Sequence, residues 1–450
     1  MPPAPPIALV PARPPAEIPL PAGPLSATDA VHLALARNPE LRTAAARITQ
    51  ARALLDGTTA AFLPRVAADV TYLHGDAPSA YLFKRIDARR LPAQVDFNDP
   101  GAFSNFEGGL GLQWNVWNGG RDVLARWSAD TVVQTATLAR NAVLNALVMT
   151  VVTTFLDVRA ADELLAADES TVRTVEAQVA ESRVKVEGGG ALRSDLLSLE
   201  VRLAEAREQG FRSETASRLA RAALRELLAL PADAAITLAD STYAAGTLPE
   251  TATEALAEAY RVRPEAAITR RAVERARIEL SAARRAYLPR VDVVSHLYAD
   301  VPDPLHDGAK DPNYTVAVAL SVDLFDGGVR AAAVQRAAAI VDELTESDRA
   351  ALLAIAHDVE TAYLHLGEAR ARYQVAAQAV GAAEESLRLV AVQYRGGGAI
   401  VTRYLEAEGA QARARTARIQ AALDVDRATI EAQRAIGRLY QSLPNGGEAG

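Results

Sequence analysis

Strict alternation of apolar and polar side chains marks two stretches of this chain, at residues 106–116 and 314–324. In the first stretch the even positions, from Phe106 to Val116, are apolar or glycine, whereas the odd positions are polar or glycine. Alternation with period two predicts a β-strand with one apolar face and one polar face. A strand of this length, tilted by about 45°, matches the roughly 25 Å apolar band of an outer-membrane β-barrel.

Two further stretches, at residues 66–74 and 291–298, alternate less regularly and are the expected partner strands. By the same phase, their polar-face positions are Ala67, Asp69, Thr71, Asp292, Val294 and His296. Four strands are too few to close a barrel, since known barrels have at least about eight. Several chains must therefore contribute to a barrel. Three would give twelve strands, but strand number alone does not choose three chains over two or four. The alternative is the half-buried sheet of a soluble protein; the long helices that flank both strand pairs favour the barrel.

Two triple glycines each separate two long alanine-rich segments of helical character. They lie 208 residues apart and comprise Gly188, Gly189, Gly190, Gly396, Gly397 and Gly398. Consecutive glycines interrupt a helix and supply the positive φ that a tight reversal needs. We therefore expect two helical hairpins, with helices at about 122–187 and 191–230 in the first and a return helix at about 399–440 in the second. Apolar residues at seven-residue spacing in the long segments indicate coiled-coil packing.

The same order of predicted elements occurs twice along the chain, which predicts an internal two-fold repeat. Asn38-Pro39 and Leu63-Pro64 return as Arg263-Pro264 and Leu288-Pro289, and each pair brackets a predicted helix. The expected organisation is a proline-rich extended arm at 1–25, a first repeat at 26–245, a second repeat at 246–440, and a flexible tail at 441–450. Each repeat holds a helix, a strand pair and a helical hairpin.

Composition narrows the class of protein further. Half of the residues are hydrophobic but only 5% are aromatic, which suits close-packed helices. The net charge of −8 argues against nucleic acid as a partner, and the absence of cysteine excludes disulfides and thiolate metal sites. Residues 1–25 lack the basic start and apolar run of a signal peptide. The uncharged stretch 141–156 is expected to be the buried face of a helix, because its counterpart 208 residues on carries charged residues.

The sequence resembles the TolC-like outer-membrane efflux channels. The resemblance covers roughly residues 26–440 and rests on the order of elements together with Asn38-Pro39-Glu40-Leu41, Leu63-Pro64, Leu324-Phe325-Asp326-Gly327-Gly328, and the spacing from Gly189 to Asp195. It implies a homotrimer whose twelve-stranded barrel continues into a periplasmic helical tunnel. It also implies two protein partners, a periplasmic adapter (a membrane fusion protein) and an inner-membrane transporter of the RND, ABC or MFS type.

The resemblance also suggests which residues act as a gate. By position, Asp195 matches the acidic partner and Tyr394 the tyrosine partner of bonds that hold the family's periplasmic entrance closed, while Arg403 and Glu406 fall where the family has a ring of acids. The six tip glycines match the site of adapter contact. Each residue also has a simpler interpretation: Asp195 as a first-turn acid, Tyr394 as a packing residue, and Arg403 with Glu406 as a solvated helix face.

Two tryptophans, Trp114 and Trp117, close the first strongly alternating strand and suit a membrane-interface belt, although aromatic residues at such junctions are also common in cores. No cofactor is implied. The six histidines lack the spacing of a helical metal site, and no phosphate loop or nucleophile elbow occurs, so we do not expect an enzyme. The function expected is a passive outer-membrane export duct. The alternative is a periplasmic or soluble coiled-coil scaffold, which would be a water-soluble monomer.

Overall fold

The computed structural model describes residues 23–439, except residues 97, 241–242, 244–245 and 303–311. The chain divides into two compact units, one made of residues 1–45, 138–267 and 350–450 and the other of 46–137 and 268–349. The first unit is helical and the second contains a sheet. Most of the predicted arm at 1–25, the whole tail at 441–450, and most of the loop between the last two strands lie outside the described residues.

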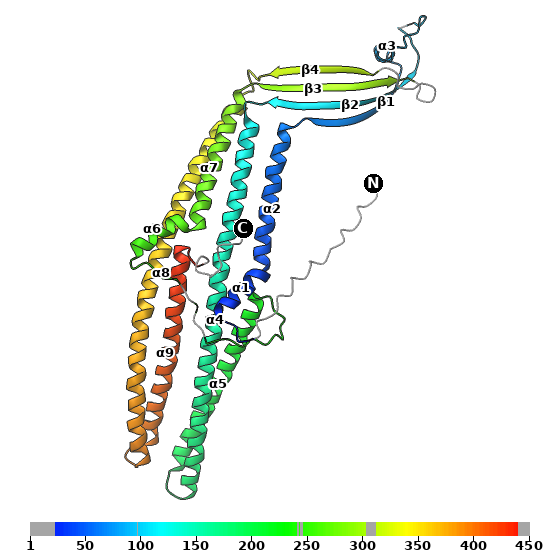
Figure 1. Ribbon diagram of the computed structural model, residues 1–450. Coiled ribbons are helices and arrows are strands. Elements are labelled where there is room, and N and C mark those ends of the chain that lie inside the picture. The colour runs from blue at the N-terminus through cyan, green and yellow to red at the C-terminus, as the bar shows by residue number, and fades with distance from the viewer. Residues whose placement is uncertain (1–22, 97, 241–242, 244–245, 303–311, 440–450) are drawn as a thin grey trace. The chain divides into compact units, whose positions relative to one another are not determined.

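The second unit is built around one four-stranded antiparallel sheet in the order β1-β2-β3-β4. The strands are β1 (Arg65–Gly75), β2 (Phe103–Trp117), β3 (Arg290–Val301) and β4 (Asn313–Ser321). All four predicted strands are confirmed, and Figure 1 shows them side by side. The last one is shorter than its alternation predicted, because pairing with β3 stops at Ser321, opposite Arg290. Residues 322–324 are alternating but have no partner strand in the described part of the chain.

The register places the alternating side chains on opposite faces of the sheet. Val293 of β3 lies opposite Trp114 of β2 and Val318 of β4, so these apolar residues share one face. That face has no cover within the described residues: the side chain of Val318, for example, is 70% exposed. The opposite face carries Asp69, opposite Gly109, and other polar side chains. The sheet is therefore amphipathic, with its apolar side open.

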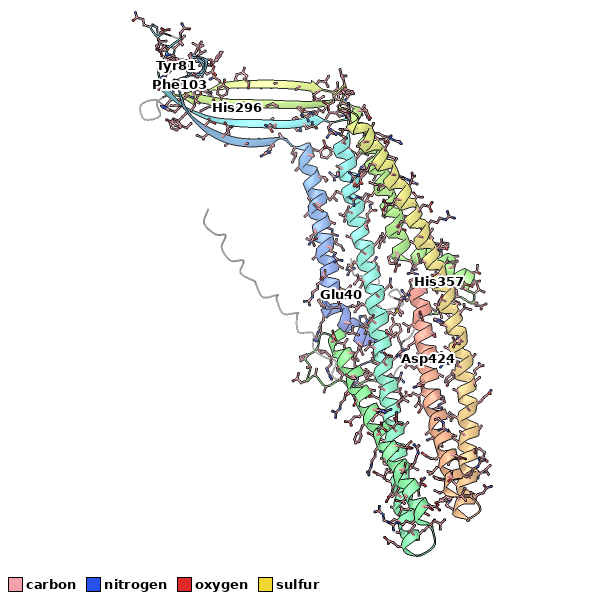
Figure 2. All side chains as sticks on the ribbon, turned by 180° about the vertical axis from the view of Figure 1, so that it is seen from behind. Glu40, Tyr81, Phe103, His296, His357 and Asp424 are labelled. Atoms are coloured by element: carbon pink, nitrogen blue, oxygen red, sulfur yellow. The ribbon has the colours of Figure 1, made fainter. Side chains whose placement is uncertain are left out.

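A short helix, α3 (Pro78–Asp87), lies between β1 and β2, where no helix was predicted from the sequence. Proline at its start has the φ of a helical first turn. Tyr81 is buried edge-on against Phe103, with ring centroids 5.4 Å apart, and Figure 2 shows both at one end of the sheet. Lys84 forms ion pairs with Glu107 and with Asp300, the second at 3.1 Å. These contacts fix α3 on the polar face.

The remaining elements are helical. They are α1 (Ala27–Arg37), α2 (Pro39–Thr59), α4 (Arg121–Glu187), α5 (Arg193–Leu227), α6 (Ala252–Val262), α7 (Pro264–Arg284), α8 (Val329–Arg395), α9 (Val401–Ile436), and the 3-10 turns η1 (Ala60–Phe62) and η2 (Arg285–Tyr287). The two longest helices, α4 and α8, have 67 residues each, which corresponds to about 100 Å. Each runs beside a shorter return helix in Figure 1, α5 and α9 respectively. Two long helical hairpins were predicted, and both are present.

Local sequence signals set the helix ends. Ser26 forms a capping box with Asp29 at the start of α1. Asn38 and Arg263 end α1 and α6 in extended conformations, because each precedes a proline that begins the next helix. These helix boundaries were predicted in the sequence from the same prolines.

The core of the helical unit forms around the uncharged part of α4. Val148, Val151, Val152 and Phe155 are fully buried together with residues of α1 and α5. Among the described helices, α4 is the one whose length and hydropathy would allow it to cross a membrane. Its most apolar side chains instead pack inside the protein, as predicted for residues 141–156.

Candidate functional site

Both hairpin tips end their long helix in the same hydrogen-bonded turn. At the first tip Gly189 has a φ of +72°, its N–H donates to the Val186 carbonyl at 3.1 Å, and the Gly190 N–H donates to the Lys185 carbonyl at 2.7 Å. This pair of bonds is the Schellman motif, which satisfies the last carbonyls of a helix. The second tip has the same bonds: Gly397 (φ +74°) to Tyr394 at 3.1 Å and Gly398 to Gln393 at 2.8 Å. A side chain at either middle glycine would be strained.

The outer glycines of each triplet are not required by the backbone. Gly188, Gly190, Gly396 and Gly398 have no positive φ, and an added Cβ would meet its nearest atoms at 3.5 Å or more. All six tip glycines are exposed. Large apolar side chains beside both tips are exposed as well: Val184, Leu192, Val392 and Ile400. The tips therefore present small, apolar and unobstructed surfaces.

The structure brings Asp195 close to Tyr394, although they lie in different hairpins. Burial raises the pKa of the Tyr394 phenol, and the negative charge of Asp195 raises it further. No hydrogen bond joins the two side chains among the described contacts. Tyr394 also stacks on Tyr404, with ring centroids 5.2 Å apart, and packs in an apolar cluster that includes Val179 and Leu199. Asp195 lies in the first turn of α5. Tyr394 is thus a packing residue and Asp195 a first-turn acid, while the charge of Asp195 still reaches the Tyr394 phenol.

Arg403 and Glu406 form an ion pair one turn apart on α9, with Arg403 Nη1 3.6 Å from Glu406 Oε2. Both side chains are more than half exposed. An exposed pair of this spacing contributes at most a few tenths of a kcal/mol to helix stability, about 0.3–0.5. The pair mainly affects local charge, because the negative charge of Glu406 compensates the positive charge of Arg403 in this part of the hairpin.

A stronger link between the hairpins was not predicted. Arg202 on α5 donates two hydrogen bonds to Glu408 on α9, from Nε to Oε2 at 2.8 Å and from Nη2 to Oε1 at 3.2 Å. The Glu408 side chain is only 6% exposed. The hydrogen bonds to Glu408 raise the pKa of the Arg202 guanidinium. This bidentate pair holds the two return helices together.

A second link joins α4 to α9, where the Gln178 side-chain amide donates to the Tyr404 hydroxyl. Burial raises the pKa of Tyr404, and the nearby charge of Glu408 adds to the effect. Beside this bond lies a cavity of about 230 Å³ whose lining includes Ser182 and Tyr394. The Ser182 hydroxyl is buried and makes no hydrogen bond to any residue that the structure describes. The two hairpins therefore meet in a partly polar and incompletely filled contact near their tips.

Trp114 and Trp117 lie near and at the end of β2, where the β2–β3 register shifts between Asn115 and Trp117. Their side chains are about two-fifths exposed, at 38% and 42%. The Trp114 indole donates from Nε1 to the Phe62 carbonyl at 3.1 Å. An exposed ring with a satisfied N–H suits an interface between apolar and polar surroundings. Within the described residues, one group of side chains has the arrangement of a metal site: Asp69, Glu107 and His296.

Comparisons with known proteins cover most of the chain. The family model described as "Outer membrane efflux protein" matches residues 30–230 and 255–438. No curated protein matches the sequence. The fold is similar to that of a membrane protein from Pseudomonas aeruginosa (TM-score 0.80, 21% identity, 91% of this chain and 93% of that chain). It is also similar to the outer-membrane channel MtrE of Neisseria gonorrhoeae in its open state (0.77, 20%, 91% and 88%) and to the outer membrane protein VceC of Vibrio cholerae (0.77, 16%, 91% and 96%).

Proposed function

The chain belongs to the outer membrane efflux protein family, and from that premise we propose how it forms an exit duct and how the duct is closed. Family membership confirms the TolC-like resemblance and the outer-membrane location, and it favours an export duct over an enzyme or a soluble scaffold. The finer features, which are the trimer, the closed barrel, the gate and the partners, are the proposal.

We propose a homotrimer in which three sheets close into one twelve-stranded barrel. The observation that carries this proposal is an open amphipathic sheet: its apolar face is exposed, and β1 and β4 each pair on one side only within the described residues. Unpaired edges and an uncovered apolar face are both unstable in water. Edge-to-edge closure with two further copies would satisfy the strands, and outer-membrane lipid would cover the apolar face. Trp114 and Trp117 would then lie at a membrane interface.

We further propose that the chain contains an internal repeat, with one structural unit at 26–245 and a second copy of it at 246–440. The equal lengths of α4 and α8 support this, as do the identical turns at the two tips. The proline-rich arm at 1–25 and the tail at 441–450 would lie outside the repeats. Of the arm, Leu25 is buried and its backbone pairs with Leu238, next to the helical core.

The gate that we propose is the contact between the hairpins near their tips. Asp195 and Tyr394 would close it together with the links from Arg202 and Gln178, and Arg403 and Glu406 would line the aperture. Paired within each chain, those two side chains would add no net charge to the opening. Because the links are few and the contact contains a cavity, a partner that binds the tips could separate the hairpins.

The tips are the proposed docking site for a periplasmic adapter. Gly188 to Gly190 and Gly396 to Gly398 expose backbone between apolar side chains, which suits close contact with another helical tip. An inner-membrane transporter of the RND, ABC or MFS type would supply the energy and select the cargo, while the duct itself would remain passive.

Replacing Asp195 with alanine and Tyr394 with phenylalanine together should raise the ion conductance of the protein in planar bilayers. The two changes remove a carboxylate and a hydroxyl from the contact that closes the entrance, while the phenylalanine ring retains the stacking with Tyr404. The measurement is single-channel conductance of the wild type and the double variant.

The matched control is Glu169→Ala with Tyr373→Phe, which removes the same chemical groups from α4 and α8 farther from the tips. Its conductance should equal that of the wild type. An assembled Asp195/Tyr394 variant with unchanged conductance would rule out this lock.

A further inference from the structure

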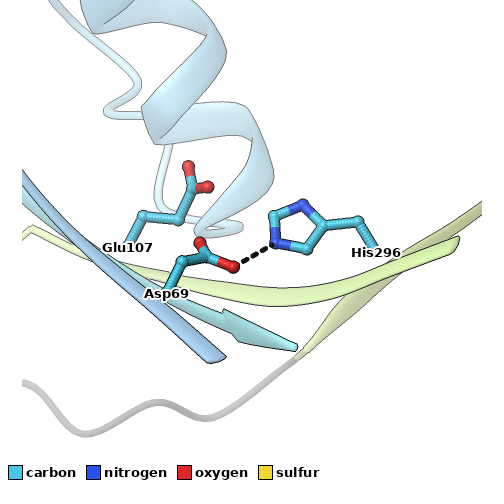
Figure 3. A group of neighbouring side chains, drawn as sticks. All are labelled: Asp69, Glu107 and His296. Carbon is cyan, nitrogen blue, oxygen red and sulfur yellow. Dashed lines mark ion pairs between the residues drawn. The ribbon is translucent and has the colours of Figure 1, made fainter. Parts of the chain in front are cut away.

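Three side chains from three strands converge on the polar face of the sheet. They are Asp69 of β1, Glu107 of β2 and His296 of β3, and their possible ligand atoms all lie within 4.8 Å of one another. Figure 3 shows them pointing toward one space, with His296 Nε2 3.4 Å from Asp69 Oδ1. Neither the export duct nor the gate requires this group.

The three side chains can converge because β2 has a glycine, Gly109, at this point of the polar face. Gly109 lies opposite Asp69 on β2, and a Cβ added at Gly109 would clash with His296 Nε2. The imidazole therefore occupies the space above this glycine and reaches from β3 across β2 to Asp69. The neighbouring Gly108 faces the other side of the sheet, and nothing lies within 4 Å of an added Cβ there.

The imidazole is held with one nitrogen unsatisfied. His296 stacks on Tyr298, with ring centroids 5.0 Å apart and an interplanar angle of 18°. Its Nε2 atom has no exposed surface and makes no hydrogen bond within the described structure. A buried polar atom without a hydrogen bond is unfavourable, and a bound ion is one way to satisfy it.

The local charge favours a divalent cation. Asp69, Glu107 and Asp300 bring three negative charges, and Lys84, paired with the last two, brings one positive charge. These four described side chains therefore sum to two negative charges when His296 is neutral. The side chain of Asp300 is fully buried, and one of its carboxylate oxygens makes no hydrogen bond to the described residues. A carboxylate has two oxygens, so Glu107 can bind a cation without releasing Lys84.

We propose that Asp69, Glu107 and His296 bind a divalent transition-metal ion such as Zn²⁺. One imidazole nitrogen and two carboxylates form a donor set that Zn²⁺ accepts, with a fourth position left for water, whereas Mg²⁺ and Ca²⁺ prefer oxygen donors alone. The ion would join β1, β2 and β3 across the polar face. Histidine spacing in the sequence gave no sign of the site, because its ligands lie on separate strands and only the antiparallel register unites them.

Titration of the detergent-solubilised full-length protein with Zn²⁺, monitored by isothermal titration calorimetry, tests the site without any transport assay. We expect one Zn²⁺ ion per chain. Gly109→Ala should weaken binding by about tenfold or more, although it removes no ligand, because the methyl group displaces the imidazole. Gly108→Ala is the matched control and should bind Zn²⁺ as the wild type does. Equal affinities of these two variants, or a wild type that binds no Zn²⁺, would overturn the proposal.

Two further variants distinguish ligand loss from misfolding. His296→Ala should lose binding, whereas Asp292→Asn, on the same strand and face but bonded to Asn115, should retain it. Lys84→Met should bind Zn²⁺ several times more tightly, because it removes the positive charge beside Glu107; a misfolded chain would not gain affinity. Binding that depends on Asp292 instead of His296, or that Lys84→Met weakens, would contradict the assignment.

Discussion

Replacing Arg202 with methionine should destabilise the contact between the two hairpins by about 3–5 kcal/mol. The variant leaves the Glu408 carboxylate, which is 6% exposed, buried without its two hydrogen bonds and without a counter-charge. Methionine fills most of the volume of the arginine stem. The loss of stability is therefore caused by the unpaired buried charge of Glu408 and not by a cavity. The measurement is the thermal unfolding of the detergent-solubilised protein, together with the rate at which a protease cleaves the hairpins.

Two controls isolate the buried pair. Arg212→Met removes an arginine from the same helix whose side chain is 71% exposed and whose partner, Glu208, lies one turn away, and it should cost about 0.5 kcal/mol or less. Adding Glu408→Leu to Arg202→Met should restore most of the stability, because no buried charge remains. If Arg202→Met were no more harmful than Arg212→Met, the pair would not hold the hairpins together.

Replacing Val318 with lysine should sharply reduce the amount of protein assembled in the outer membrane. Val318 lies in the middle of β4 on the apolar face, where its side chain is 70% exposed. A lysine facing lipid near the bilayer midplane costs about 2–4 kcal/mol per chain. The measurement is the quantity of folded oligomer in the outer-membrane fraction.

The neighbouring residue gives a matched control for this prediction. Ala317 is also exposed in the single chain but faces the polar side of the sheet, opposite Val294. Ala317→Lys should assemble nearly as well as the wild type, since its charge would face water in the lumen. Equal assembly of the two lysine variants, or the reverse order, would contradict the proposed orientation of the sheet.

The sequence was most informative where local chemistry decides the structure. Alternation located all four strands, and Pro39, Pro264 and the glycine triplets located helix ends, because these residues act within one turn. The end of β4 was placed too far along the chain, at Leu324 instead of Ser321. Alternation persists there, but a strand ends where its partner ends, and β3 begins at Arg290.

Contacts between segments that are distant in the chain could not be predicted from the sequence. Nothing distinguishes Arg202 or Glu408 from the many other charged residues on the long helices until the hairpins are packed. The helix α3 was missed because it is short and depends on contacts such as Tyr81 with Phe103. The approach of Asp195 to Tyr394 was suggested by family resemblance, yet the hydrogen bonds described between the hairpins near their tips involve Gln178 and Arg202.

We expect the open amphipathic sheet to close as part of a trimeric outer-membrane duct. Membrane fractionation of the exported protein, followed by determination of the mass of the detergent-extracted particle by light scattering, tests it most directly. A particle of three chains should be recovered from the outer membrane. A water-soluble monomer would contradict the barrel, the trimer and the duct together.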